Sequence, residues 1–257
     1  MTNLDERISA ATQFIEHVDL PRASSSARAG EDFSAKIKPV NSQQSLAIGH
    51  GIVTFVPKMP SRQREAVANS FLLAQLAADK RASAGRDLDE WYRVFFEALT
   101  HIGWLIEHRG FNEYTTRGEE VETNQAILGI AAALLGSGTA AYLLVKATLD
   151  ALGKLSQEDW IVLFRINSQS RTEELFQIAV AEPDEQGNTS IKLMAFQIAA
   201  KSTRTGVLFF KWGIAEATLR YFSGKVTYTT SIADHVAGLI AERVRSYTAD
   251  YVTNLEI

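Results

Sequence analysis

QAILGIAAALLGSGTAAYLLV, residues 125–145, is a run of twenty-one residues without a formal charge. About 20 apolar residues in a helix cover the hydrocarbon core of a bilayer, so the run predicts either a membrane-crossing helix or a helix buried inside a globular fold. A third interpretation comes from GSGTAA at 136–141, which resembles the glycine-rich turn of a dinucleotide site. The fold depends on which of the three is right.

The composition of the run favours a buried helix. Only eight of its residues are Ile, Leu or Val, so membrane insertion would be marginal. The spacing of Ala132, Gly136 and Ala140 suits close helix packing, in a membrane or in a globule. A dinucleotide site needs a glycine where Ala141 stands, and no βαβ repeat follows.

We therefore expect a central apolar helix that continues to about Leu152 and is closed by Gly153. It would contact a membrane only after leaving the core. The residues that would form this membrane or lipid segment are Ile127, Leu128, Ile130, Ala132, Leu134, Leu135, Gly136, Ala140, Leu143 and Leu144.

Upstream of the run, the pattern predicts an N-terminal helix at 1–18, a linker or wrapping segment at 19–45, and a single domain over 46–257. The linker is rich in Ser, Ala, Pro and charged residues, a composition that does not offset the entropy of ordering. The expected elements that follow are a strand at 46–56, a helix at 61–81, a helix from about Asp87 to Gly110, and a short strand within 111–121.

After residue 173 the apolar period changes from helical to two. Alternation in 176–180 and 194–198, separated by PDEQGN at 183–188, predicts a hairpin. Further strands are expected at 207–212, 217–222 and 225–229, with a turn at Ser223-Gly224, before a last helix that buries Ile232, Val236, Leu239, Ile240 and Val244. The sequence thus predicts an α+β fold, a layered domain whose mainly antiparallel C-terminal sheet is packed by helices.

Charge and cysteine content exclude several functions. The formal net charge of -4 and the pI near 5.8 argue against nucleic-acid binding, and the absence of cysteine excludes disulfides, thiolate nucleophiles and cysteine zinc sites. Because Asp5 and Glu6 precede any apolar stretch, no secretory signal peptide is expected. We expect a cytoplasmic location in the producing cell, with any export independent of a signal peptide.

Two polar groups are candidate sites, and no catalytic residue is predicted. Glu97, His101, Trp104 and His108 would share one helix face, but histidines seven apart do not match the zinc spacing. Lys211, Arg220 and Lys225 are a candidate anion site, with the wet face of a sheet as the alternative. No metal ligand set, Walker loop or Gly-x-Ser-x-Gly motif is present.

Five segments resemble the Evf-type bacterial virulence factor group and related proteins encoded beside pore-forming insecticidal toxins. They are SLAIGHGIVTFVP (45–57), SRQREAVANSFLLAQLAADKR (61–81), DEWYRVFFEALTHIGWLIEHRGF (89–111), the apolar central helix, and VLFFKWGIAEATLRYFSGKVTYTTSIADHVAGLIAERV (207–244). The resemblance implies an α/β fold, no demonstrated catalytic centre, and a role in colonising or poisoning an invertebrate gut through a membrane or fatty-acyl link. In that group the acyl chain is attached to cysteine, so only noncovalent lipid carries over.

The sequence therefore predicts a non-enzymatic virulence or toxin-accessory protein that associates with a membrane, a lipid or a toxin partner protein. No cofactor is expected beyond a noncovalently held fatty acid or lipid. Two alternatives stay open, an enzyme with a small-molecule site, nucleotide-linked or hydrolytic, and a scaffold protein of an operon.

Overall fold

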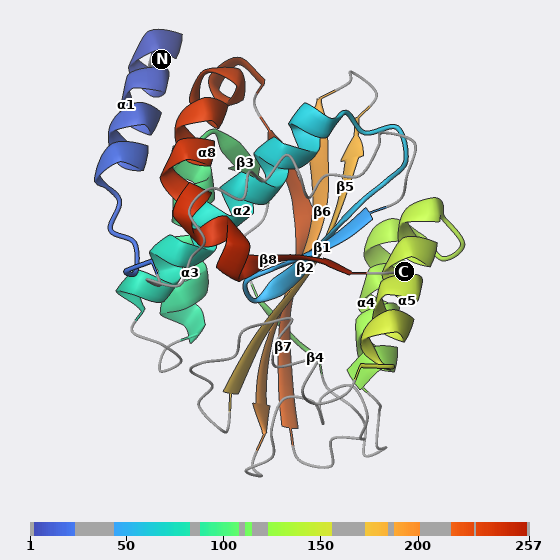
Figure 1. Ribbon diagram of the computed structural model, residues 1–257. Coiled ribbons are helices and arrows are strands. Elements are labelled where there is room, and N and C mark those ends of the chain that lie inside the picture. The colour runs from blue at the N-terminus through green and yellow to red at the C-terminus, as the bar shows by residue number, and fades with distance from the viewer. Residues whose placement is uncertain are drawn as a thin grey trace.

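The computed structural model describes residues 3–23, 44–82, 88–107, 111–114, 123–155, 173–184, 188–200, 217–228 and 230–255. In this part of the chain, one mixed sheet lies between two layers of helices (Figure 1). The predicted α+β class is confirmed.

The helices and strands keep the order of the chain. The helices are α1 (Leu4–His17), α2 (Ser61–Arg81), α3 (Leu88–His101), α4 (Thr123–Leu135), α5 (Ala140–Leu152) and α8 (Thr230–Tyr251). The strands are β1 (Gln44–Ile48), β2 (Gly51–Phe55), β3 (Trp104–Ile106), β4 (Asn112–Tyr114), β5 (Glu173–Pro183), β6 (Thr189–Ala200), β7 (Ala217–Tyr228) and β8 (Val252–Leu255).

The sheet has the strand order β3-β7-β6-β5-β2-β1-β8, and β4 pairs with β7 beside this path. The β2–β5 pairing is parallel, and the other pairings among the described strands are antiparallel. The predicted hairpin at 173–200 is confirmed as β5 and β6. Its connection is closed by Asp184, whose backbone N–H donates to the Asn188 carbonyl over 2.8 Å.

Both faces of the sheet are buried, so its central strands are apolar on both sides. One face packs against α2, α3 and α8, with Phe222 and Val226 of β7 pointing into that core, and α1 packs on α8 and α3. The other face, with Ile178 and Met194, packs against α4 and α5. Side chains alternate along each strand, so one strand serves both cores.

Helix α1 docks against α8, with Ala11 and Ile15 buried and Leu4 largely exposed. After the helix, the Arg243 Nη2 donates to the Val18 carbonyl over 2.8 Å and the Tyr247 hydroxyl donates to the Pro21 carbonyl over 2.6 Å. The predicted N-terminal helix is confirmed. The last two residues of the predicted linker, 44 and 45, belong to β1.

The predicted strand at 46–56 is instead a two-stranded hairpin. Gly49 has φ +51°, a left-handed conformation that glycine adopts at little cost, and the His50 backbone N–H donates to Gln75 Oε1 over 3.0 Å. The turn therefore places β1 and β2 side by side in the sheet.

The long helix predicted to run to Gly110 ends at His101. Gly103 has φ +98°, and a Cβ there would lie 3.0 Å from Ile232 Cγ2 of α8, so the chain turns tightly before β3. The predicted capping residue Asp87 and the predicted stop at Gly110 lie outside the described residues.

The uncharged run is two helices and not the single helix that we predicted. Gly136 and Gly138 have φ values of +83° and +88°, and Thr139 begins α5 by accepting a hydrogen bond on Oγ1 from the Tyr142 backbone N–H. Helices α4 and α5 consequently lie side by side as a helical hairpin on one sheet face (Figure 1). The glycine-rich turn thus joins two helices, whereas a dinucleotide site needs a strand before it.

Within the described ranges, no helix combines the length and the apolar character that crossing a bilayer requires.

The turn predicted at Ser223-Gly224 is absent, because β7 runs through it and pairs with β6 along its whole length. The Phe222 ring lies over Gly224, where a Cβ would meet Phe222 Cζ at 2.8 Å. The predicted last helix is confirmed as α8, which buries Ile232, Val236, Ile240 and Val244 and leaves Leu239 39% exposed. The strand predicted at 207–212 lies outside the described residues.

Candidate functional site

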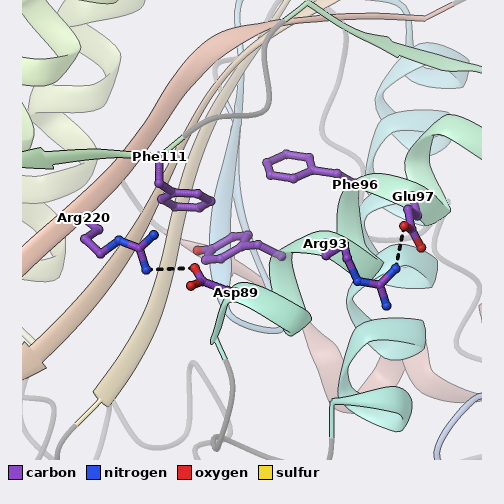
Figure 2. Close-up of a pocket in the computed structure, with 7 residues that line it drawn as sticks. Asp89, Arg93, Phe96, Glu97, Phe111 and Arg220 are labelled. Atoms are coloured by element: carbon purple, nitrogen blue, oxygen red, sulfur yellow. Dashed lines mark hydrogen bonds and ion pairs between the residues drawn. The ribbon is translucent and has the colours of Figure 1, made fainter.

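A cleft of about 300 Å³ lies between α3 and the strands β4 and β7 (Figure 2). Helix α3 contributes five of its side chains at spacings of three and four residues, which places them on one helix face. The lining residues are Asp89, Tyr92, Arg93, Phe96 and Glu97 of α3, Phe111 before β4, and Arg220 of β7. The volume of the cleft is at the lower end of the range found for small-molecule binding sites.

The floor of the cleft is aromatic. The Tyr92 ring lies 4.9 Å from that of Phe111 between centroids, and the Phe96 ring lies 4.9 Å from that of Phe222. The Tyr92 hydroxyl donates to the Phe196 carbonyl over 3.0 Å, and burial raises the pKa of Tyr92 above its ordinary value. Tyr92 is therefore a neutral anchor that fixes the floor to the sheet.

Two guanidinium–carboxylate pairs form the rim. Arg220 Nη1 lies 2.8 Å from Asp89 Oδ1, and its guanidinium lies 5.7 Å from the centre of the Phe111 ring. On the other wall, Arg93 pairs with Glu97 at 2.6 Å (Figure 2) and also with Glu90.

The hydrogen bond from Arg93 lowers the pKa of Glu90, and its two carboxylate partners raise the pKa of Arg93. Each guanidinium thus already has an acidic partner. The aromatic floor and paired charges suit the binding of a flat, small group, and ring stacking supplies its binding surface.

The predicted polar stripe is not assembled, because the helix that would carry it ends at His101. Glu97 and His101 lie on α3, and His101 Nδ1 contacts the Glu97 carbonyl at 2.7 Å. Trp104 lies on β3, buried between Phe71 and Tyr228. His108 lies outside the described residues.

The predicted anion site is also divided. Arg220 and Lys225 are five residues apart on β7, so their side chains point to opposite sheet faces. Arg220 lines the cleft, whereas Lys225 lies opposite Lys192 of β6 on the other face. Lys211 lies outside the described residues. The sequence analysis did not identify Asp89, Phe111 or Lys192, because the residues that they meet come from distant segments of the chain.

The structure brings no three His, Asp or Glu side chains together as a metal site in the part of the chain that it describes.

The predicted membrane or lipid segment forms the inner and outer surfaces of the α4–α5 hairpin. Toward the sheet are the buried residues Ile127, Ile130, Leu135 and Leu144, at the border are the half-buried residues Leu128, Ala132 and Leu134, and facing outward are Gly136, Ala140 and Leu143. Leu143 is 55% exposed. The segment therefore presents an apolar surface to solvent as well as to the core.

Three buried hydroxyls hold α5 to the sheet. Ser45 Oγ lies 2.8 Å from Thr54 Oγ1, and Thr148 Oγ1 of α5 lies 3.3 Å from Ser45 Oγ and 3.4 Å from Thr54 Oγ1. All three residues are fully buried. The interface between the hairpin and the sheet thus contains a small hydroxyl cluster within an otherwise apolar contact.

The fold and site together define an α/β/α sandwich with a mixed sheet, a helical hairpin on one face whose turn and flanking residues carry no formal charge, and an aromatic cleft at the edge of the other face. No protein-family model matches the chain, and no curated protein matches it.

Three solved structures are similar to this chain at low identity. A delta-endotoxin is 16% identical, with a TM-score of 0.43 over 70% of this chain and 81% of that chain. The Evf virulence factor is 13% identical, with a TM-score of 0.39 over 92% of this chain and 89% of that chain. The activated Cyt2Ba monomer from Bacillus thuringiensis subsp. israelensis is 16% identical, with a TM-score of 0.41 over 71% of this chain and 98% of that chain. The Evf virulence factor, whose group the sequence analysis names for its resemblance to this chain, is thus among the similar structures.

Proposed function

We propose that this chain is a non-enzymatic protein of the toxin or virulence type that binds lipid membranes through the α4–α5 hairpin. The observation that carries the proposal is the exposed, uncharged end of the hairpin, with Leu143 55% exposed beside its turn. Two of the similar structures are a delta-endotoxin and a virulence factor. We propose a role of the same type for this chain.

The outer surface of the hairpin carries small and apolar side chains toward its turn. Gly129, Ala133, Ala140 and Leu143 are exposed there, and no formal charge occurs between residues 123 and 145. The first charged side chain on α5 is Lys146. The turn can therefore approach lipid without removing a charge from water, which would be costly.

The free energy gained by burying this exposed surface in a membrane is small. Full burial of a leucine side chain contributes about 1.5–3 kcal/mol, so the exposed half of Leu143 alone gives only weak attachment. Stronger binding requires the hairpin to turn its inner residues, such as Ile127, Ile130 and Val145, from the sheet to lipid.

The geometry of the helices favours binding at the membrane surface. Each of α4 and α5 has 13 residues and is about 20 Å long at 1.5 Å per residue, whereas the hydrocarbon core is about 30 Å thick. We propose that the pair lies in the interface, with its apolar side toward the acyl chains. Since the chain has no cysteine, no acyl chain can be attached to it through a thioester, and we propose that lipid is held noncovalently.

Co-sedimentation with liposomes, at neutral and at mildly acid pH, tests this proposal. Leu143→Asp places a charge in the proposed contact and is expected to reduce the bound fraction about tenfold, because a charged side chain in apolar surroundings costs more than 1.4 kcal/mol. The matched control is Leu239→Asp, which changes another exposed leucine on α8 of the opposite helical layer. Equal binding by the two variants, or no binding of the unchanged chain at either pH, would contradict the proposal.

The aromatic cleft favours a second candidate function, the binding of a small molecule. Its floor of Tyr92, Phe96 and Phe111 offers ring surface, and its rim offers two charge pairs. A thermal-shift screen with small aromatic compounds tests this candidate, because a ligand that binds only the folded state raises the melting temperature. Phe111→Ala should abolish any such shift.

A further inference from the structure

On the helix wall of the aromatic cleft, two carboxylates share one guanidinium. Arg93 Nε and Nη2 donate to Glu90, and Arg93 Nη1 donates to Glu97 Oε1 over 2.6 Å. Every nitrogen of this guanidinium is therefore engaged, whereas Glu97 Oε2 has no hydrogen-bond partner among the described residues. Arg81 lies close enough to help Arg93 lower the pKa of Glu90. The helix wall thus has two acids, two bases and one open carboxylate oxygen.

On the sheet wall, the second guanidinium also has two carboxylates on its side of the cleft. Arg220 Nη1 donates to Asp89 Oδ1 over 2.8 Å, and the same oxygen accepts from Gln197 Nε2 over 3.0 Å. Asp89 Oδ2 has no hydrogen-bond partner in the part of the chain that the structure describes. Glu113 of β4 is the direct partner of Arg220 in the antiparallel register, on the same sheet face, and forms no ion pair with a described residue. This wall therefore has two carboxylates for one guanidinium.

The described charged groups of the two walls have one negative charge in excess. They are Asp89, Glu90, Glu97 and Glu113 against Arg81, Arg93 and Arg220. The rings of the floor act in the same direction, because the face of an aromatic ring attracts a cation. The guanidinium of Arg220 lies 5.7 Å from the centre of the Phe111 ring and 2.8 Å from Asp89. The cleft thus already holds one cation of its own by a ring and a carboxylate together.

We propose, on the basis of the small-molecule function given above for the cleft, that its ligand is a flat organic cation. The apolar part of the ligand lies against the Phe111 ring, and its N–H groups donate to an open carboxylate oxygen of Asp89 or Glu97 in a charge-assisted hydrogen bond. These two acids are eight residues apart on α3, about 12 Å along the helix, so a small cation contacts one of them while both attract it. A neutral compound of the same shape gains no such attraction, and an anion meets the excess negative charge.

Benzamidine, benzamide and benzoate test the sign of the ligand charge, because each has a benzene ring with one small planar group and the three differ in charge. In thermal unfolding at matched ionic strength, benzamidinium should raise the melting temperature most and benzoate least. We expect the apparent Kd of benzamidinium to be about fivefold lower than that of benzamide, the upper range for an exposed ion pair. This difference should disappear in about 1 M NaCl, where the Debye length is about 3 Å. Equal rises for the three compounds, or the largest rise with benzoate, would overturn the proposal.

Glu97→Gln tests whether the cation is attracted by the cleft itself. The substitution removes one charge with little change in size, so the affinity for benzamidinium should fall about threefold, while the affinity for benzamide should stay the same. The matched control is Glu242→Gln, which removes a 67% exposed carboxylate of α8 that pairs with Arg245 outside the cleft. This control should bind benzamidinium as the unchanged chain does. The same loss in both variants would show that benzamidinium responds only to the net charge of the protein, which would contradict the assignment to the cleft.

Phe111→Ala separates the preference for a cation from the binding function itself. The Phe111 ring contributes to the contact with each compound, so the melting temperature of this variant should rise with none of the three. Equal rises in the unchanged chain that are lost in Phe111→Ala would contradict the preference for a cation and leave the cleft as a binding site. No rise with any compound in the unchanged chain would contradict the binding function of the cleft, and the preference for a cation with it.

Discussion

At the residue scale, His50 links the β1–β2 turn to both helical and sheet neighbours. Its Nε2 lies 2.9 Å from Asp79 Oδ1, and the same oxygen accepts from Trp91 Nε1 over 2.7 Å. Next to it, Gln75 Nε2 donates to Gln177 Oε1 over 3.0 Å. Burial acts to lower the pKa of His50, but the charge and hydrogen bond of Asp79 outweigh it, so the pKa lies above its ordinary value.

This arrangement predicts a pH-dependent stability. A histidine whose pKa is raised by folding stabilises the fold fully below its unfolded pKa of about 6.5, and the contribution is lost as pH rises through the folded value. Urea unfolding of His50→Asn should therefore show a larger loss of stability relative to the unchanged chain at about pH 5 than at about pH 8. A loss that grows toward alkaline pH would show that His50 stabilises the fold in its neutral form.

Arg64 is a second residue whose environment gives a sharp expectation. It is fully buried in α2, where its Nε donates to the Met59 carbonyl over 3.0 Å and its Nη2 to the Val56 carbonyl over 3.4 Å. Arg64→Met keeps a long side chain but removes these donors, and an unsatisfied buried acceptor costs about 1–3 kcal/mol. We expect a loss of that size in the free energy of unfolding.

Arg62 is the matched control for this substitution, since it lies two residues away on the same helix. Its ion pair with Asp234 is 3.4 Å long and its side chain is 73% exposed. Exposed pairs contribute about 0–1 kcal/mol, so Arg62→Met should cost less than Arg64→Met by denaturant unfolding. Equal losses would mean that the buried hydrogen bonds of Arg64 contribute nothing.

At the element scale, the α4–α5 turn determines that the uncharged run is a hairpin. Gly138 has φ +88° and no neighbouring atom within 4 Å of a built Cβ. Substitution by alanine therefore meets no steric obstacle, and its cost is conformational. Gly138→Ala should lower the free energy of unfolding by about 1–2 kcal/mol, the cost of a left-handed conformation in an L-residue.

Gly129 gives the opposite expectation in the same hairpin. It is exposed in the interior of α4, with nothing within 4 Å of a built Cβ. Gly129→Ala should raise the free energy of unfolding by about 0.5–1 kcal/mol, because alanine loses less backbone entropy in a helix. Changes of the same sign in the two variants, measured in urea, would contradict the turn geometry.

At the scale of the whole molecule, local patterns predicted the elements better than their ends. The alternation in β5 and β6 and the helical repeat of α2 were sufficient to predict these elements. Gly103, Gly136 and Gly224 were misassigned, since a glycine can end a helix, make a turn or lie under an aromatic ring in a strand. Which of these occurs depends on distant partners such as Ile232 and β6.

The candidate sites show the same division between local and distant information. Glu97 was predicted correctly as a residue of α3, but the residues across the cleft, Phe111 and Arg220, come from the segment before β4 and from β7. Arg220 was predicted beside Lys225, whereas the unbroken β7 puts the two on opposite faces. The parallel β2–β5 pairing was not predicted at all, because no local pattern encodes it. The positions of Arg220 and Lys225 in the sheet depend on strand register, and register is set by pairing between segments that are distant in the sequence.

The position of β1 in the sheet has a consequence for how the protein is made. β1 pairs with β8, and the side chain of Gln44 contacts that of Asn254, 210 residues along the chain. A ribosome synthesises β1 early and β8 late, so during most of translation one edge of β1 has no strand to pair with. Such distant pairing slows folding and prolongs the exposure of strand edges. We therefore expect the nascent chain to expose this strand edge for longer than a protein whose neighbouring strands follow one another in sequence.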